Sequence, residues 1–147
     1  MIDTAIQRLE HLIAIIPVLL RTVNEEVLAS KPSPLKWSQK EILGHLIDSA
    51  TNNHQRFVRG QFEDKPMIFY DQNQWVVYNH YQETKTEQLI EFWTLYNRHL
   101  LRVIKSIPNE NLERTCTGRD GKELTLDFLI NDYVEHLEHH LRQIVRY

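Results

Sequence analysis

The chain has 147 residues, of which 41% are hydrophobic and 25% charged, a composition typical of a globular protein that buries its own core. A net charge of −3, with basic and acidic residues interspersed, gives no general electrostatic drive towards nucleic acid or anionic lipid, so we expect neither partner. The single cysteine, Cys116, excludes a disulfide within the chain and favours a reducing compartment, so we expect one domain over residues 1–147 in the cytoplasm.

The first predicted helix starts near Asp3 and runs into the twenties. Its apolar residues recur at helical spacing along one stripe: Ile6, Leu9, Ile13, Ile16 and Leu20. The apolar run from Leu12 to Leu20 is about half the length that a membrane span needs. It also contains Pro17, which kinks a helix or starts a new turn. We therefore expect an amphipathic core helix that does not cross a membrane.

The second predicted helix has the clearest start signal in the chain, "WSQKEI". Ser38 stands where it caps the helix, and Glu41 stands where it completes a capping box. Trp37 precedes the cap and can pack onto Ile42 as a hydrophobic staple. The helix is expected to run to about Arg59, because the glycine that follows favours a stop.

Between Gln61 and Glu83 the periodicity weakens and aromatic residues accumulate: Phe62, Phe69, Tyr70, Trp75, Tyr78 and Tyr81. A connection of this length in a compact domain more often covers a cleft than hangs free. The sequence therefore predicts a long aromatic-rich loop between the second and third long helices.

The third predicted helix lies in "TKTEQLIEFWTLYNRHLLRVIKSIP". Thr84 and Glu87 are spaced as a capping box at its start. Pro108 is expected to end it, because proline cannot continue a helix.

A hairpin and a last helix complete the predicted fold. Asp120-Gly121 is a strong short signal for a hairpin turn. The last helix is expected to start near Thr125 and to end with Arg142 and Arg146, where the helix dipole favours cations. Four amphipathic helices of about 20 residues predict an all-α fold, an antiparallel four-helix bundle with a small hairpin before the last helix.

The last helix carries three histidines in "HLEHH". At about 100° per residue, His136 and His140 fall at the edge of the apolar stripe, whereas His139 projects from the polar face. The i, i+4 spacing puts the two inward imidazoles on adjacent turns, where they can bind one ion or, alternatively, be hydrogen-bonded without metal. The segment is not an HExxH motif, because Leu137 follows His136.

A third metal ligand has to come from elsewhere in the chain. The other histidines are the candidates, beside the carboxylates: His11, His45, His54, His80 and His99. On the second helix, periodicity slightly prefers His54, which falls within the apolar stripe. His45 lies on the flank of that stripe, beside Ser49 and Asn52.

The segments "KWSQKEILGHLIDSATNNHQRF" and "DYVEHLEHHLRQI" together resemble the DinB/YfiT superfamily of small metal-binding four-helix bundles. In that family an HL-x-DS stretch carries one histidine ligand, and H-x-x-x-H on the last helix carries two more. "IFYDQNQW" also resembles the PYDExxW segment of the YfiT branch. The resemblance spans about Trp37 to Ile144.

The resemblance implies His45, His136 and His140 as metal ligands, with His54 as the replacement for His45. Gln143 stands where YfiT-like sequences often have another histidine, which puts an outer contact of the site in question.

Three imidazole ligands leave a divalent ion with positive charge and open positions, which is typical of a catalytic site. Zinc or nickel is expected first, and iron or manganese also suit such ligands. The resemblance implies a stress or detoxification enzyme, in which a metal-held low-molecular-weight thiol, such as bacillithiol or mycothiol, attacks a small electrophile. It also leaves open a metal-dependent hydrolase, or a non-catalytic metal-binding module that forms a homodimer.

Three further residues are candidates for a role at this site. Asp48, one turn after His45, is a candidate outer carboxylate, although the helical wheel places it on the solvated side. Tyr133, one turn before His136, could line the site, or be a core tyrosine without function. Trp75, with Tyr70, could form a lid or simply pack the long loop. Cys116 has no sequence neighbour that would activate it.

Overall fold

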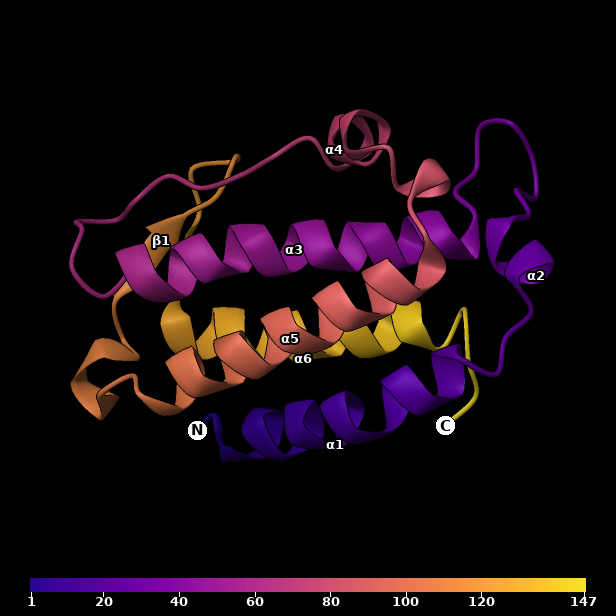
Figure 1. The fold of residues 1–147 in the computed structure, drawn as a ribbon. Coiled ribbons are helices and arrows are strands. Elements are labelled where there is room, and N and C mark those ends of the chain that lie inside the picture. Colours follow the sequence, from indigo (N-terminus) through magenta and orange to yellow (C-terminus); the bar gives the residue numbers. More distant parts are fainter.

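The computed structural model describes all 147 residues and confirms a mainly helical bundle with a small hairpin. Its four long helices are α1 (Asp3–Leu20), α3 (Gln39–Arg59), α5 (Thr86–Lys105) and α6 (Leu126–Leu141). In Figure 1, α3 lies beside α5 and α6, and α1 closes the bundle against α5 and α6. Its core is one cluster of 30 buried residues.

The directions of the helices differ from a strictly antiparallel arrangement. Figure 1 shows α3 and α5 running in the same direction, and α1 and α6 both running in the opposite direction. The connection from α3 to α5 returns along the whole length of the bundle before α5 begins. A long crossover of this kind lets two consecutive helices run parallel.

The start of α3 confirms the predicted capping box. The Ser38 hydroxyl accepts a hydrogen bond from the Glu41 backbone N–H at 3.0 Å, and the Glu41 carboxylate accepts one from the Ser38 N–H at 3.1 Å. Both donors would otherwise lack a partner inside the helix. The cap fixes the first turn of α3 and therefore the direction in which His45 projects.

The predicted long loop contains helical structure that periodicity did not reveal. Helix α4 (Gln72–Asn79) begins at Asp71, whose side chain accepts hydrogen bonds from the backbone of Asn73 and Gln74, and it is followed by the short 3₁₀ helix η1 (Tyr81–Glu83). Only Val76 of α4 is buried, so its sequence lacks the apolar stripe that predicts a helix. The segment packs along α3 and covers it.

A second short helix was also missed. Helix α2 (Glu25–Ala29) lies between α1 and α3, and its N-cap is Asn24, whose side chain accepts a hydrogen bond from Glu26. A helix of five residues is too short to show a period.

The capping box predicted at the start of α5 is wrong. The N-cap is Lys85, which makes no side-chain cap. Thr84 instead donates its hydroxyl to the His80 carbonyl, and the Glu87 carboxylate binds the guanidinium of Arg21, the residue that follows α1. Ion pairing between helices therefore replaces local capping.

The hairpin forms where Asp120-Gly121 predicted it. Strands β1 (Thr115–Thr117) and β2 (Glu123–Thr125) pair antiparallel, with Cys116 opposite Leu124. Gly121 has φ +76°, which glycine adopts without strain. Thr125 then caps α6 through the Phe128 N–H, and the helix ends at Leu141, before the arginines that were expected to end it. Separately, none of the helices is both long enough and apolar enough to span a membrane.

Candidate metal centre

Three histidines from two helices, α3 and α6, meet where these helices pack against each other. His45 comes from the first third of α3, and His136 and His140 come from the last two turns of α6. One ligand atom of each residue lies within 4.8 Å of the other two. The ring centroids of His45 lie 5.0 Å from those of both His136 and His140.

The closest approach has the geometry of two ligands on one ion. His45 Nε2 and His136 Nε2 lie 3.1 Å apart. Two nitrogens bound to one ion at about 2.1 Å lie about 3.0–3.4 Å apart for bond angles between 90° and tetrahedral. The observed separation falls within that range.

The hydrogen-bonding capacity of His45 supports the same reading. Its Nδ1 atom is buried and has no hydrogen-bond partner. If His45 carries its proton on Nε2 and donates to His136, a lone pair on Nδ1 is buried unpaired. If the proton is on Nδ1, that N–H is buried without an acceptor. Either tautomer leaves an unmatched polar group in the interior, which costs free energy. When both rings carry the proton on Nδ1, two Nε2 lone pairs face each other, and this is the arrangement that a cation between the rings would match.

The structure places His45 in the cluster and His54 outside it. His45 is only 1% exposed, although its position on the flank of the apolar stripe disfavoured it. His54 is hydrogen-bonded through Nδ1 to the Tyr96 hydroxyl and packs on His99. The cluster therefore contains His45 and not His54, which periodicity slightly preferred. The rings of Trp37, His136 and His140 pack around His45 and make the flank of α3 at this position an interior surface.

The division of the three C-terminal histidines agrees with the helical wheel. His136 and His140 are half-buried and face His45, whereas His139 is exposed. His11, His80 and His99 are also exposed and do not belong to the cluster.

The outer nitrogens of the two α6 histidines have polar neighbours. His136 Nδ1 lies 3.4 Å from the Ser49 hydroxyl, and His140 Nδ1 lies 3.3 Å from Gln143 Oε1. Gln143 Oε1 can only accept, so it favours a proton on Nδ1 of His140, which leaves Nε2 free as a ligand. Gln143 thus supplies an outer contact of the site, the contact that the resemblance had put in question. Neither partner was predicted, although Ser49 follows His45 by one turn.

The electrostatics of the cluster keep the imidazoles neutral. Burial, with the neighbouring imidazoles, lowers the pKa of His45 to about 3 and that of His136 to about 4. Burial also lowers the pKa of His140. Neutral imidazoles present lone pairs, so protons compete little with a cation for these nitrogens near neutral pH.

Asp48 is buried rather than solvated, and this corrects the expectation from the helical wheel. It is 1% exposed, because the end of α4 and η1 pack over it. Its Oδ1 accepts hydrogen bonds from the Tyr81 hydroxyl and from Asn79 Nδ2. Its Oδ2 is buried without a partner, as is Nδ1 of His45 one turn earlier. Burial raises the pKa of the Asp48 carboxyl to about 6.

The other candidates lie further from the cluster or at its edge. The Tyr133 hydroxyl is buried and donates to Asn97 Oδ1 at 2.6 Å, so it belongs to the core network. Trp75 and Tyr70 pack edge to face with ring centroids 5.5 Å apart, within the segment that covers α3. Cys116 is buried on the hairpin, and burial raises its thiol pKa.

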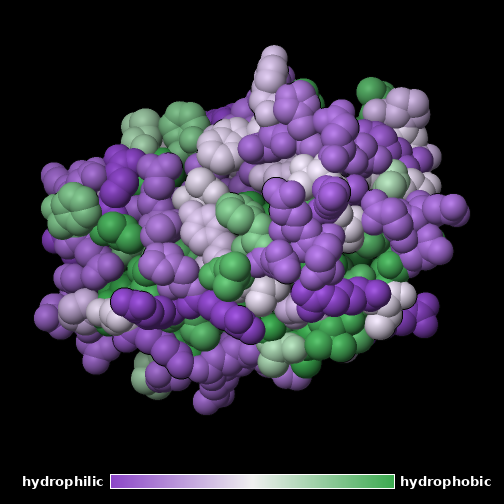
Figure 2. Space-filling model, in the orientation of Figure 1, coloured by the Kyte–Doolittle hydropathy of each residue, from purple (hydrophilic) through white to green (hydrophobic).

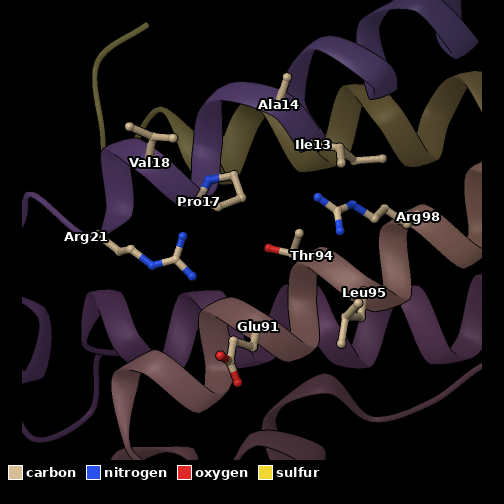
Figure 3. A pocket seen from close by; sticks show the side chains of 9 residues that line it. All are labelled: Ile13, Ala14, Pro17, Val18, Arg21, Glu91, Thr94, Leu95 and Arg98. Atoms are coloured by element: carbon tan, nitrogen blue, oxygen red, sulfur yellow. The ribbon is translucent and has the colours of Figure 1, made fainter.

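Two open cavities differ in their relation to the histidines. One, of about 400 Å³, is lined in part by Trp37 and Gln143, each of which contacts a histidine of the cluster. A larger one, of about 490 Å³, lies between α1 and α5 (Figure 3). Trp37 and Gln143 therefore connect the smaller cavity to the candidate metal centre, whereas none of the three histidines lines the larger one.

Comparison with known proteins gives consistent matches in sequence and fold. A family model described as the DinB superfamily matches residues 8–144. A Bacillus cereus (strain AH820) protein named "putative metal-dependent hydrolase" is 26% identical over 145 residues, which cover 98% of this chain and 83% of that protein. Proteins of Bacillus anthracis with the same name match equally well.

Solved structures share the fold. YfiT from Bacillus subtilis, described as "a probable metal-dependent hydrolase with an unusual four-helix bundle topology", superposes with a TM-score of 0.87 at 22% identity, covering 97% of this chain and 82% of YfiT. A mycothiol-dependent maleylpyruvate isomerase superposes with a TM-score of 0.79 at 8% identity, covering 97% of this chain and 60% of that one. These similarities establish the bundle.

Proposed function

This chain belongs to the DinB superfamily, and from this premise we propose that it is a divalent-metal-dependent enzyme whose ion is held by His45, His136 and His140. The observation that carries the proposal is the convergence of three imidazole nitrogens within 4.8 Å, two of them facing each other at 3.1 Å. The metal-dependent names of the relatives point in the same direction.

An ion bound by three neutral imidazoles would supply Lewis acidity and lower the pKa of a thiol or a water molecule at an open position. Zinc and nickel suit these ligands best, and iron or manganese are the next candidates. The protein would hold the three ring nitrogens at positions where they can bind one ion. It would also keep the rings unprotonated, because burial lowers the pKa of His45 and of His136.

The leading chemistry that we propose is transfer of an external thiol to a small electrophile. No carboxylate hydrogen-bonds to the three imidazoles; their partners are one another, Ser49 and Gln143. An ionised thiol is nucleophilic without a general base, so the surroundings suit this chemistry. The only cysteine of the chain is buried on the hairpin, and the thiol would therefore come from a co-substrate.

Asp48 has an outer, positioning role in this proposal. When an ion binds His45 Nε2, the ring proton resides on Nδ1 and needs an acceptor. The unpartnered Asp48 Oδ2 is a buried acceptor one turn away, and its other oxygen is fixed by Tyr81 and Asn79. We assign Trp75 and Tyr70 to the cover of the site and Tyr133 to the core.

Hydrolysis is the alternative chemistry, and the names of the relatives favour it. It requires proton transfer to a leaving group in addition to an activated water. A carboxyl whose pKa is raised to about 6, such as that of Asp48, is suited to that task, if it reaches the substrate.

An activity assay separates these chemistries. Metal-loaded protein is given a generic electrophile, chlorodinitrobenzene, with bacillithiol, mycothiol, glutathione or cysteine, and separately nitrophenyl esters without thiol. Thiol consumption that disappears after chelation and in His136→Ala, but not in His54→Ala, supports the transferase. Metal-dependent ester cleavage without thiol supports the hydrolase instead. Metal binding with no turnover of either kind contradicts the enzymatic proposal.

A further inference from the structure

A small cavity lies at the end of the bundle where α3 finishes. The polar flank of α3 that carries His45 continues for about three turns beyond it and reaches Arg56. On α6, Asp132 lies about one turn before His136. Because the two helices run in opposite directions, both residues reach the same end of the bundle, where the hairpin packs beside the end of α3 (Figure 1). There Arg56 and Asp132 line one open cavity of about 140 Å³.

The Arg56 guanidinium is half-buried and forms no ion pair. It donates from Nη1 to Asn53 Oδ1 at 3.1 Å and from Nη2 to the Ile68 carbonyl at 3.0 Å. Its Nε–H has no partner and keeps accessible surface. Hydrophilic residues dominate the face shown in Figure 2, where charged side chains are hydrated. Arg56 has instead lost part of its hydration, and burial lowers the pKa of its guanidinium.

Asp132 presents the opposite charge to the same cavity without contacting Arg56. The two charges attract each other across the cavity. Part of the Asp132 side chain is exposed, and burial of the remainder, with the neighbouring Glu135, raises the pKa of its carboxyl. Both pKa shifts favour the neutral form of the side chain, so each charge lacks a full partner.

The rest of the lining is uncharged. It consists of three apolar side chains, one hydroxyl and a glycine: Cys116, Leu124, Leu129, Thr117 and Gly118. The Cys116 thiol donates to the Arg56 carbonyl at 3.8 Å, which holds the hairpin against the end of α3.

The charges around the cavity are balanced. Two of them are paired, Arg59 with Glu63 and Glu123 with Lys65. The unpaired charges on the hairpin and on the turn after Asp132 are two of each sign: Arg119, Lys122, Asp120 and Glu135. The neighbourhood therefore favours neither a net anion nor a net cation.

A ligand with a single charge suits this cavity poorly. A carboxylate that meets Arg56 is repelled by Asp132, and an ammonium that meets Asp132 is repelled by Arg56. A ligand that carries both charges close together can pair with both side chains. The volume of the cavity equals that of roughly five water molecules at about 30 Å³ each, which limits such a ligand to a few non-hydrogen atoms.

We propose that this cavity binds a small free α-amino acid, whose carboxylate pairs with Arg56 and whose ammonium pairs with Asp132. The carboxylate accepts the free Nε–H of Arg56, and the side chain of the ligand lies against Leu124 and Leu129. The small volume and apolar wall make alanine the best fit. None of the three histidines lines this cavity, so the site is separate from the proposed metal centre.

Two-dimensional NMR of the protein during titration with L-alanine tests the proposal. Acetate and methylammonium are the probes with one charge, and L-phenylalanine tests the size limit. Alanine should shift the amide signals of Thr117 and Gly118 and bind at least about tenfold more tightly than each of the other probes. Acetate that binds as tightly as alanine, or alanine that leaves these signals unchanged, overturns the inference.

Substitutions of the two charged residues should affect the probes differently. Asp132→Asn should weaken alanine binding at least about fivefold and, because the repulsion is removed, strengthen acetate binding about twofold. Arg56→Gln should weaken both ligands about tenfold. The matched control is Glu135→Gln, an acidic residue of the same helix outside the lining, which should change neither affinity. Unchanged alanine affinity in Asp132→Asn, an exposed position, overturns the inference even if Arg56→Gln does not fold.

A final control concerns metal, because an amino acid can also bind a metal ion directly. The titration is therefore repeated in His45→Ala, which lacks one ligand of the proposed metal centre. Alanine affinity and the set of shifted signals should stay the same. Loss of alanine binding in this variant would place the ligand on the ion and contradict the proposal. Failure of the proposed function would appear instead as absent turnover in metal-loaded protein that still binds alanine.

Discussion

His45 and His136 stand 91 positions apart in the chain, and their Nε2 atoms lie 3.1 Å apart in the folded protein. No local pattern joins them; α3 and α6 do, because these two helices pack against each other in opposite directions. The two nitrogens face each other, and neither neutral tautomer of His45 gives both of its ring nitrogens a partner; the pair therefore suits the cation that we propose. The predictions below follow from this relationship and from the buried carboxyl beside it.

Replacing Asp48 by asparagine should stabilise the metal-free protein at neutral pH. Burial raises the pKa of this carboxyl from its ordinary value of 3.8 to about 6, so the stability it contributes is fully present below pH 3.8 and is lost as the pH rises through 6. Asp48→Asn removes the ionised group and keeps an acceptor for Tyr81. Urea unfolding at pH 5 to 8 should show the variant gaining about 1–3 kcal/mol over wild type towards pH 8. A gain that grows towards acid would contradict the assigned burial.

The same substitution should weaken metal binding. We propose that Asp48 Oδ2 accepts the Nδ1 proton of metal-bound His45; in Asp48→Asn the oxygen stays with Tyr81 and Asn79, so the group towards His45 becomes an NH2, which donates and cannot accept. Outer partners of metal ligands typically contribute 10- to 100-fold in affinity. Competition against a chromophoric chelator measures this loss. A variant that is more stable without metal but binds metal more weakly is the result expected of a positioning residue. Unchanged metal affinity would show that Asp48 does not act at the metal site.

Tyr133→Phe tests whether the Tyr133 hydroxyl serves the core or the metal centre. The variant leaves Asn97 Oδ1 without its buried donor, which should lower the free energy of unfolding by about 1–3 kcal/mol. Metal affinity should stay at the wild-type value, since the hydroxyl is bonded to Asn97. Weaker metal binding in a folded variant would show that the tyrosine does reach the site.

Gly44→Ala tests how η1 is held against α3. A Cβ at this position would overlap the Tyr81 ring, so the ring and its bond to Asp48 must shift. We expect a cost of about 1–3 kcal/mol in chemical denaturation. The matched control introduces Gly44→Ala into a Tyr81→Ala variant, which lacks the ring. In that background Gly44→Ala should lower the free energy of unfolding by at least about 1 kcal/mol less than it does in wild type. Equal costs in both backgrounds would contradict the contact.

The sequence predicted the parts of this structure that depend on local signals. The capping box of Ser38 and Glu41, the hairpin at Gly121 and the inward pair His136 and His140 all follow from short-range rules and formed as expected. The family resemblance was needed for His45, because periodicity alone preferred His54.

What the sequence could not show was created by the crossover between α3 and α5. A helical wheel assumes one buried face, and it therefore placed Asp48 in solvent and His45 at the margin. Helix α4 and η1 pack over Asp48, and Trp37 and the two α6 histidines pack around His45, so both residues are buried. The crossover also makes α3 and α5 parallel, because it carries the chain back along the bundle before α5 begins. No local propensity predicts this direction.

Metal content of untagged protein tests the central claim most directly, with wild type compared with His45→Ala and with His54→Ala, a histidine on the same helix outside the cluster. After loading with zinc or nickel and removal of excess ion, elemental analysis should find one ion per chain in wild type and His54→Ala. His45→Ala should hold a small fraction of that amount. A stoichiometric ion in His45→Ala, or its loss in His54→Ala, would contradict the three-histidine centre.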